Sequence, residues 1–81
     1  MQVEVISPQK IVYKGEAEMA EFPGENGKFQ VLENHAPLMS TLSKGEVLLT
    51  KGAKVSERFS IIGGYVEVKE NKIIVLINEA L

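Results

Sequence analysis

The sequence predicts an all-β domain, and three observations support that prediction. Apolar and polar residues alternate with a period of two along much of the chain, as in residues 65–69. Turn-forming Gly, Pro, Asn and Ser residues recur at spacings of about ten residues. No window shows the apolar stripe of a substantial helix, in which positions i, i+3, i+4 and i+7 are apolar. About eight or nine short strands at this spacing predict a β-sandwich or a β-barrel.

The alternation and the turn residues place the strands along the chain. Pro8 and Gly15 interrupt apolar runs, and the slip of the alternation near Ala20 predicts a bulge or a strand break there. Asn26-Gly27 lies in the strongest turn, residues 23–27, where a tight turn with positive φ is expected. The predicted strands are residues 3–5, 11–14, 16–22, 28–32, 38–42, 45–50, 58–62, 65–69 and 72–77.

Length and composition exclude several classes of protein. The 81 residues predict a single domain over residues 1–81, with 44% hydrophobic residues to build its core. No cysteine is present, which excludes a disulfide and fits a reducing, cytoplasmic setting, and one histidine is too few for a His-based metal site. A net charge of −2 without a basic patch argues against nucleic-acid binding.

Neither a signal peptide nor a membrane-spanning segment is predicted. The longest apolar run, Ile73 to Ile77, is far shorter than the roughly 20 residues that a spanning helix requires. The opening MQVEVIS lacks the basic and apolar regions of a signal peptide. Any contact with a membrane is therefore expected to run through another protein, without direct insertion.

Apolar residues occur on both faces of some predicted strands. Ile73, Val75 and Ile77 fall on one side of the last strand, whereas Ile74 and Leu76 fall on the other. A two-layer sandwich buries only one face of each sheet, so the second set would be exposed. We interpret these outward residues as a protein interface. The alternative is that the outer face simply tolerates scattered apolar residues.

No constellation of residues suggests catalysis or a cofactor. His35 is the only candidate for a base at neutral pH, and no acid lies near it in the sequence. Aspartate is absent, and the glutamates occupy single positions that we expect to face solvent. The glycines fit turns and not a phosphate loop, because no GKS or GKT follows them. We therefore predict a protein with no catalytic residue, no cofactor and no metal.

Two segments together carry a family resemblance. Residues 24–38, GENGKFQVLENHAPL, resemble the G-x-x-G-x-apolar-x-apolar-x-x-x-H-A-P-L signature of the epsilon subunits of F-type ATP synthases. Residues 63–68, GGYVEV, followed by a hairpin, an apolar last strand and Asn78-Glu79-Ala80, are similar to the second signature of that family. The opening residues 3–7 and the KGEV of residues 44–47 also fit, so the resemblance covers nearly the whole chain.

The resemblance implies a fold and a role. The fold would be a flattened β-sandwich of about ten short, mostly antiparallel strands. The domain would turn with the central stalk, bind the gamma subunit and the c-ring, and couple ion translocation to ATP synthesis without chemistry of its own. It would lie peripherally at the cytoplasmic face of the bacterial inner membrane. The residues implied at the gamma subunit are Ser7, His35 and Ser40, and those at the c-ring are Glu25, Asn26, Gly27 and Lys28.

Some features depart from the resemblance. Lys28 stands where the family often has an acidic residue, and Glu33-Asn34 stand where it often has glycine or Pro-Gly. Many family members continue into a C-terminal helical hairpin that inhibits ATP hydrolysis and in some binds ATP. Because this chain stops at Leu81, we expect neither that inhibitory arm nor its nucleotide site.

Two other functions stay open. A small all-β carrier or protein-binding module, such as a biotinyl or lipoyl domain, would need a lysine at the tip of a tight turn. Lys28 follows a turn, but Gly27-Lys28-Phe29 lacks the expected flanking pattern. A small hydrolase would have to rely on His35 alone.

Overall fold

The computed structural model describes residues 1–78, which form nine β-strands. Glu79 and Ala80, which end the second family motif, lie outside the described residues. The strands are β1 (Gln2–Ile6), β2 (Ile11–Glu16), β3 (Met19–Gly24), β4 (Gly27–Leu32), β5 (Leu38–Leu42), β6 (Gly45–Lys51), β7 (Lys54–Ile61), β8 (Gly64–Lys69) and β9 (Lys72–Ile77).

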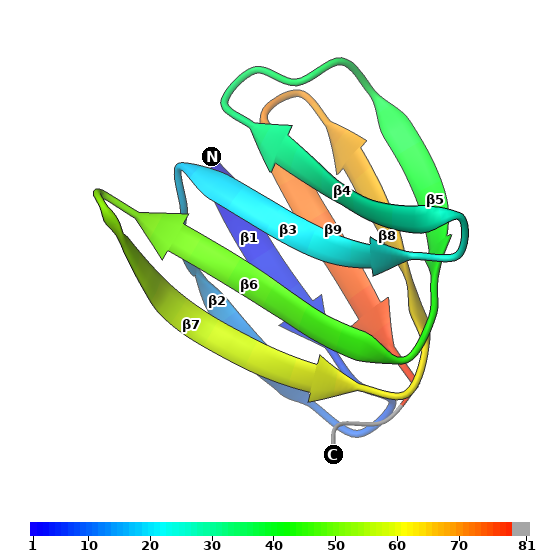
Figure 1. Ribbon diagram of the computed structural model, residues 1–81. Coiled ribbons are helices and arrows are strands. Elements are labelled where there is room, and N and C mark those ends of the chain that lie inside the picture. The colour runs from blue at the N-terminus through cyan, green and yellow to red at the C-terminus, as the bar shows by residue number, and fades with distance from the viewer. Residues whose placement is uncertain (79–81) are drawn as a thin grey trace.

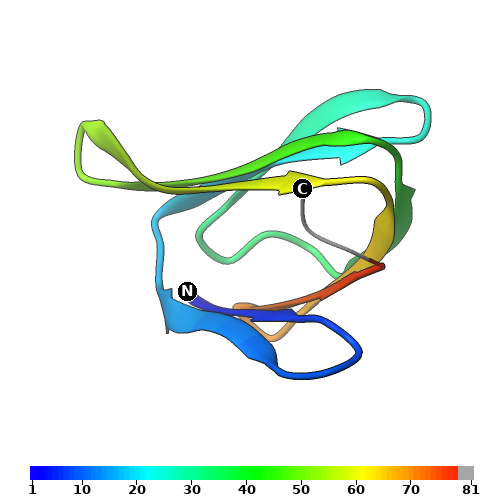
Figure 2. The ribbon, with the colours of Figure 1, turned by 90° about the horizontal axis from the view of Figure 1, so that it is seen from below.

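The nine strands form one sheet that folds over on itself. Its order is β2-β1-β9-β8-β5-β3-β6-β7, and β4 pairs with β3 beside that path (Figure 1). The link between β5 and β3 is a single residue pair, Gly24 with Leu42, and the sheet folds there. Figure 2 shows the two resulting layers, one above the other. Among the strands of residues 1–78 only β1 and β9 pair in parallel, so the prediction of a mostly antiparallel β-sandwich is confirmed.

One apolar core fills the space between the layers. Alternate residues of each strand point into it, as the period of two predicts. The inward set of β9 is nearly inaccessible to solvent, as are its partners on β1 and β8. The buried apolar residues are Met1, Val3, Val5, Ala17, Ala20, Phe22, Val31, Leu42, Val47, Leu49, Ile61, Val66, Val68, Ile73, Val75 and Ile77.

Aromatic residues close the open side of the sandwich. β2 and β7 are the end strands of the sheet, and the rings of Tyr13 on β2 and Phe59 on β7 lie 5.6 Å apart. The Tyr13 ring also covers Gly15, whose Cβ position would come within 2.8 Å of its ring carbon. Gly15 was expected to end this strand, but β2 continues to Glu16, because the glycine leaves room for the ring.

The third strand also differs from the prediction. The bulge expected near Ala20 is absent, because β3 keeps its register with β4 through that residue. The interruption lies instead at Ala17 and Glu18, where the chain crosses from one layer to the other. Pro23, expected in the turn, belongs to β3, and its carbonyl accepts a hydrogen bond from the Ser43 N–H at 2.8 Å.

The tight turn predicted at Asn26-Gly27 is present between β3 and β4, and its positive φ of 125° falls on Gly27. One further prediction of local structure was wrong. Strand β7 begins at Lys54, four residues before the predicted start at Arg58. Its first half, residues 54–57, has Val55 as its single apolar residue and so shows no period of two, whereas backbone pairing with β6 forms the strand.

Candidate docking surface

An apolar row crosses the outer face of the layer formed by β2, β1, β9, β8 and β5. Ile6 pairs with Ile11 on one side and with Leu76 on the other, and Leu76 pairs with Tyr65. Side chains of directly opposed residues have Cβ atoms about 4.5–5.5 Å apart, so these four form a continuous row. Ile11, Leu76 and Tyr65 are 59%, 47% and 37% exposed, and Ile6 is half-buried. We call these four residues the apolar row.

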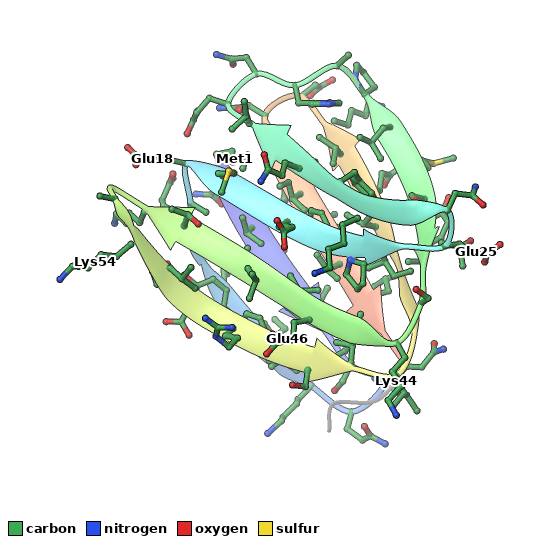
Figure 3. The ribbon with its side chains drawn as sticks, viewed as in Figure 1. Met1, Glu18, Glu25, Lys44, Glu46 and Lys54 are labelled. Atoms are coloured by element: carbon green, nitrogen blue, oxygen red, sulfur yellow. The ribbon has the colours of Figure 1, made fainter. Side chains whose placement is uncertain are left out.

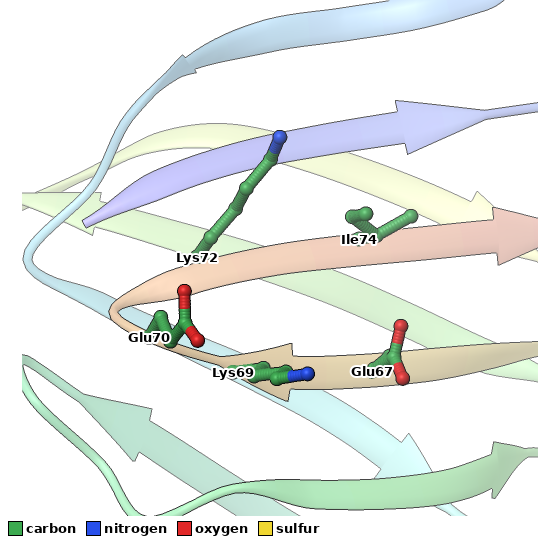
Figure 4. A pocket seen from close by; sticks show the side chains of 5 residues that line it. All are labelled: Glu67, Lys69, Glu70, Lys72 and Ile74. Carbon is green, nitrogen blue, oxygen red and sulfur yellow. The ribbon is translucent and has the colours of Figure 1, made fainter.

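The outer face becomes more polar away from the apolar row. The next row contains Ile74 and the 64%-exposed Met39, separated by Glu67. Beyond it, at the β8–β9 turn, the face is charged. Figure 4 shows Lys72 extending from β9 toward β1 and the side chains of Glu67, Lys69 and Glu70 along β8 and the turn. With Ile74 these residues line a shallow depression of about 250 Å³. The face therefore changes from apolar at one end to charged at the other.

A groove extends the apolar row at the opposite end of the layer. It has a volume of about 340 Å³ and lies beside the β1–β2 turn. Its lining residues are Ile6, Ser7, Pro8, Leu76, Ile77 and Asn78. Two members of the apolar row thus also form the wall of this groove. The apolar surface therefore reaches the edge of the molecule at Ser7.

Ser7 and Ser40, two of the residues implied at the gamma subunit, hold backbone structure. The Ser7 hydroxyl hydrogen-bonds the N–H and the carbonyl of Lys10, at 3.3 and 3.2 Å, and closes the β1–β2 turn. Ser40 lies on β5 opposite the buried Val66, and its hydroxyl donates to the Thr41 carbonyl at 3.1 Å. Ser40 therefore occupies the side of β5 opposite to Met39 and Thr41, which are exposed on the outer face.

His35, the third of these residues, lies in the loop of residues 33–37 between β4 and β5. We call this segment the His35 loop. The His35 N–H donates to the Leu32 carbonyl at 3.1 Å. Its Nδ1 lies 2.6 Å from the Ala36 carbonyl oxygen, and because a carbonyl only accepts, that contact requires the proton on Nδ1. The imidazole is half-buried, and its Nδ1 proton is already used within the loop.

The structure does not bring Ser7, His35 and Ser40 together. The His35 loop bonds to the β8–β9 turn, at the start of β9, whereas Ser7 follows the end of β1. β1 and β9 run parallel over five paired residues, so the two ends lie about 17 Å apart at ~3.3 Å per residue. Ser40 lies on β5 between these ends. The three residues therefore flank the layer that carries the apolar row.

A polar network ties the His35 loop to two distant segments. The Glu33 carboxylate accepts from the Met1 ammonium at 2.6 Å and from the Asn71 side-chain amide at 3.2 Å. The Asn71 carbonyl oxygen Oδ1 accepts from the backbone N–H of Asn34 at 2.8 Å. The Met1 ammonium also donates to the Ala17 carbonyl at 3.0 Å. We call Met1, Glu33, Asn34 and Asn71 the loop clamp.

The ion pair within the loop clamp makes stability depend on pH at both ends of the range. The hydrogen bond to Glu33 raises the pKa of the Met1 ammonium above its ordinary value of 8.0, although burial opposes this. The hydrogen bond from that ammonium, helped by Asn71, lowers the pKa of Glu33 below 4.5. The Met1 contribution is complete below pH 8.0 and is lost as pH rises through its folded-state pKa. The Glu33 contribution is complete above pH 4.5 and is lost as pH falls through its lower folded-state pKa.

Replacing Glu33 by glutamine should therefore reduce stability most between pH 4.5 and 8.0, where both charges are present. Urea unfolding of both proteins across that range and beyond it measures the difference. Glu70→Gln is the matched control, because within residues 1–78 the Glu70 side chain makes no ion pair. Equal pH profiles for Glu33→Gln and the unmodified protein would contradict a contribution from the pair.

The segment implied at the c-ring is the exposed tip of the β3–β4 hairpin. Glu25, Asn26, Gly27 and Lys28 are all exposed, and Figure 3 shows Glu25 projecting from this tip on the opposite side of the molecule from Lys54. The Glu25 N–H donates to the Thr41 carbonyl at 3.2 Å, which holds the base of the tip against β5. The tip is thus a fixed, polar projection beside the layer that carries the apolar row.

Within residues 1–78, no group of three or more His, Cys, Asp or Glu side chains is placed to hold a metal ion. Over the same residues no helix is long and apolar enough to span a membrane.

Comparisons with known proteins relate this arrangement to one family. The family model described as "ATP synthase, Delta/Epsilon chain, beta-sandwich domain" matches residues 1–81. The ATP synthase epsilon chain of Leptospira borgpetersenii serovar Hardjo-bovis (strain JB197) is 46% identical over 76 residues, which are 94% of this chain and 59% of that protein. The epsilon chain of Chlorobaculum tepidum is 42% identical over 77 residues, which are 95% of this chain and 88% of that protein.

Solved structures share the fold. A cryo-EM structure of the Euglena gracilis mitochondrial ATP synthase with its OSCP, F1 and c-ring contains a chain that matches with a TM-score of 0.87 and 17% identity, over 98% of this chain and 51% of that one. A chain from the Tetrahymena thermophila mitochondrial ATP synthase central stalk and c-ring matches with a TM-score of 0.82 and 15% identity, over 99% and 64%.

The lengths of these relatives limit which of their properties can be assigned to this chain. This chain spans 59% of the length of its Leptospira relatives, so it corresponds to part of those proteins. The match to the family model, in contrast, covers the whole chain. The chain therefore belongs to the family of ATP synthase delta/epsilon chain β-sandwich domains.

Proposed function

We propose that this domain is a non-catalytic rotor element of an F-type ATP synthase, which docks on the gamma subunit through the apolar row. The continuous apolar row across β2, β1, β9 and β8, three of whose four members are exposed, is the observation that carries this proposal. Contiguous exposed apolar residues of this kind are typical of a protein interface, whereas single exposed apolar residues are common on any surface. The row adjoins Ser7, and the His35 loop lies beside the β8–β9 turn at the other end of the same layer, so both residues border the layer that carries the row.

The proposal extends to the rest of the docking surface. Ser7, His35 and Ser40 would lie at or near the border of the gamma interface, with Met39 and Ile74 extending its apolar part. The β3–β4 tip, Glu25 to Lys28, would contact the c-ring. The domain would remain peripheral to the bacterial inner membrane at its cytoplasmic face, and it would transmit rotation without a catalytic residue or a cofactor.

A charge placed in the apolar row tests this proposal. Leu76→Lys should weaken binding to purified gamma subunit by about 10- to 100-fold, because docking would bury the lysine without a partner. Calorimetric titration of gamma with each variant measures the affinity. Val55→Lys is the matched control, because Val55 is also a strand residue, is 44% exposed, and lies on the outer face of the other layer.

Each outcome has a definite meaning. Weaker binding by Leu76→Lys with unchanged binding by Val55→Lys supports docking through the apolar row. Equal affinity of both variants and the unmodified protein would remove the apolar row from the interface. Weaker binding by Val55→Lys alone would place the interface on the opposite layer. Urea unfolding of both variants confirms that they fold, since both positions face solvent.

A further inference from the structure

The His35 loop does not determine its own shape. Asn34 adopts the left-handed conformation, with φ of 59°, which costs energy for a residue other than glycine. Within the loop, the His35 N–H bonds to the Leu32 carbonyl, which closes the turn but leaves the Asn34 N–H to a partner elsewhere. That partner is Asn71, which lies 37 residues away in the β8–β9 turn. The conformation of the loop is therefore tied to a turn in another part of the sheet.

Asn71 is held rigidly for this role. It and Glu70 form a two-residue hairpin turn in which both residues have positive φ, 59° and 52°. Turns of this kind match the twist of the paired strands and fix the turn residues in one conformation. The Asn71 backbone carbonyl also accepts from the Gln2 N–H at 3.3 Å. The side chain of Asn71 therefore starts from a backbone that β1, β8 and β9 hold in place.

The side-chain amide of Asn71 has a donor for one of its partners and an acceptor for the other. Its oxygen accepts from the Asn34 N–H and its nitrogen donates to the Glu33 carboxylate. The reverse orientation would place the NH₂ against an N–H and the oxygen against a carboxylate, so only one orientation satisfies both contacts. Glu33 is itself held by the Met1 ammonium. One side chain thus engages two consecutive residues at the start of the His35 loop.

We propose that Asn71 is a positioning residue that holds the His35 loop in the conformation used for docking. This inference rests on the proposed function for its binding consequence, but the effect on the loop belongs to the free domain. Without the Asn71 side chain the loop samples other conformations, and only a fraction of molecules presents His35 correctly. Apparent affinity falls in proportion to that fraction.

The variant Asn71→Gly isolates this role. Glycine accepts the positive φ at position 71, so the turn is retained and only the side-chain contacts are removed. Glu70→Gly is the matched control, because it makes the same change at the neighbouring left-handed residue. Within residues 1–78 the Glu70 side chain makes no contact with the His35 loop through a hydrogen bond or an ion pair.

Two measurements on each variant test the proposal. Hydrogen exchange of the Asn34 amide in the free domain, followed by NMR, should accelerate at least about 10-fold in Asn71→Gly and stay unchanged in Glu70→Gly, because only the first loses the acceptor. Affinity for the gamma subunit should fall by about 3- to 10-fold in Asn71→Gly alone. Urea unfolding of both variants measures any loss of global stability, and exchange and affinity are compared under conditions where each variant is folded.

The outcomes distinguish this inference from the proposed function. Unchanged Asn34 exchange in Asn71→Gly would overturn the inference whatever the affinity. Faster exchange with unchanged affinity, in an assay where Leu76→Lys does weaken binding, would overturn the docking role of Asn71 and leave the proposed function standing. If the unmodified domain does not bind gamma, the proposed function fails, and the exchange result alone decides whether Asn71 positions the loop.

Discussion

Replacing Phe22 by alanine is expected to lower the free energy of unfolding by about 3–5 kcal/mol, the usual loss for a fully buried phenylalanine. Phe22 is 0% exposed, and its ring centroid lies 5.5 Å from that of Phe29, its cross-strand partner on β4. β3 connects the two layers, because it pairs with β4, β5 and β6. The cavity would therefore open where the two layers meet.

The size of this loss matters because the domain is small. A single domain of this length is typically stable by only about 5–10 kcal/mol, so Phe22→Ala should be largely unfolded in mild urea. Chemical unfolding followed by circular dichroism measures the change. Phe22→Leu keeps most of the volume and should lose less than about 1.5 kcal/mol. A loss of less than about 1.5 kcal/mol in Phe22→Ala as well would show that the site repacks and that Phe22 does not bridge the layers.

The sequence predicted the strands that alternate cleanly. β8 and β9 match the prediction to within one residue, because their inward valines and isoleucines are separated by polar or outward residues. The assignment of the β9 residues to an inner and an outer face is also confirmed, whereas the interpretation of the outer residues as an interface stays a prediction. Ile73, Val75 and Ile77 are buried, whereas Leu76 is 47% exposed in the apolar row.

The sequence failed where tertiary contacts override the local pattern. Nothing near Gly15 indicates that a tyrosine ring two residues earlier will cover it and allow β2 to continue. The full apolar row was equally hidden, because it depends on the pairing of β1 with β9, which lie about 70 residues apart in the sequence. Cross-strand register of this kind cannot be derived from alternation alone.

Some residues of the candidate site could likewise be identified from the local sequence, whereas others could not. His35 and the β3–β4 tip were identifiable from motifs that the sequence carries locally. The strands predicted at residues 65–69 and 72–77 place Asn71 in the hairpin turn between them, and its left-handed φ confirms that placement. Its side-chain contacts with Glu33 and Asn34 were not foreseen, because those residues lie 38 and 37 positions away. A motif thus identified the loop, whereas only the fold reveals what holds it.

Gly64, the second glycine of the Gly63-Gly64 motif, links the fold directly to the apolar row. It begins β8 and pairs with Leu42 on β5 and with Ile77 on β9. A Cβ atom at Gly64 would overlap the backbone carbonyl oxygen of Leu76 and lie 3.2 Å from the Ile77 Cα. Backbone atoms of a paired strand cannot move aside as a flexible side chain can, so β8 and β9 would have to separate at this end.

Gly64→Ala is therefore expected to destabilise the domain by about 2–4 kcal/mol and to weaken gamma binding more than this loss of stability explains. The displaced backbone belongs to Leu76 and adjoins Tyr65, so the variant disturbs two members of the apolar row without changing a residue in it. Gly63→Ala is the matched control, because its Cβ would meet the side-chain amide of Asn78 at 3.0 Å, which can rotate away. Urea unfolding and titration with gamma, under conditions where each variant is folded, measure the two effects. Equal tolerance of both alanines would mean that the strands can shift without cost, and that the motif serves only the turn before β8.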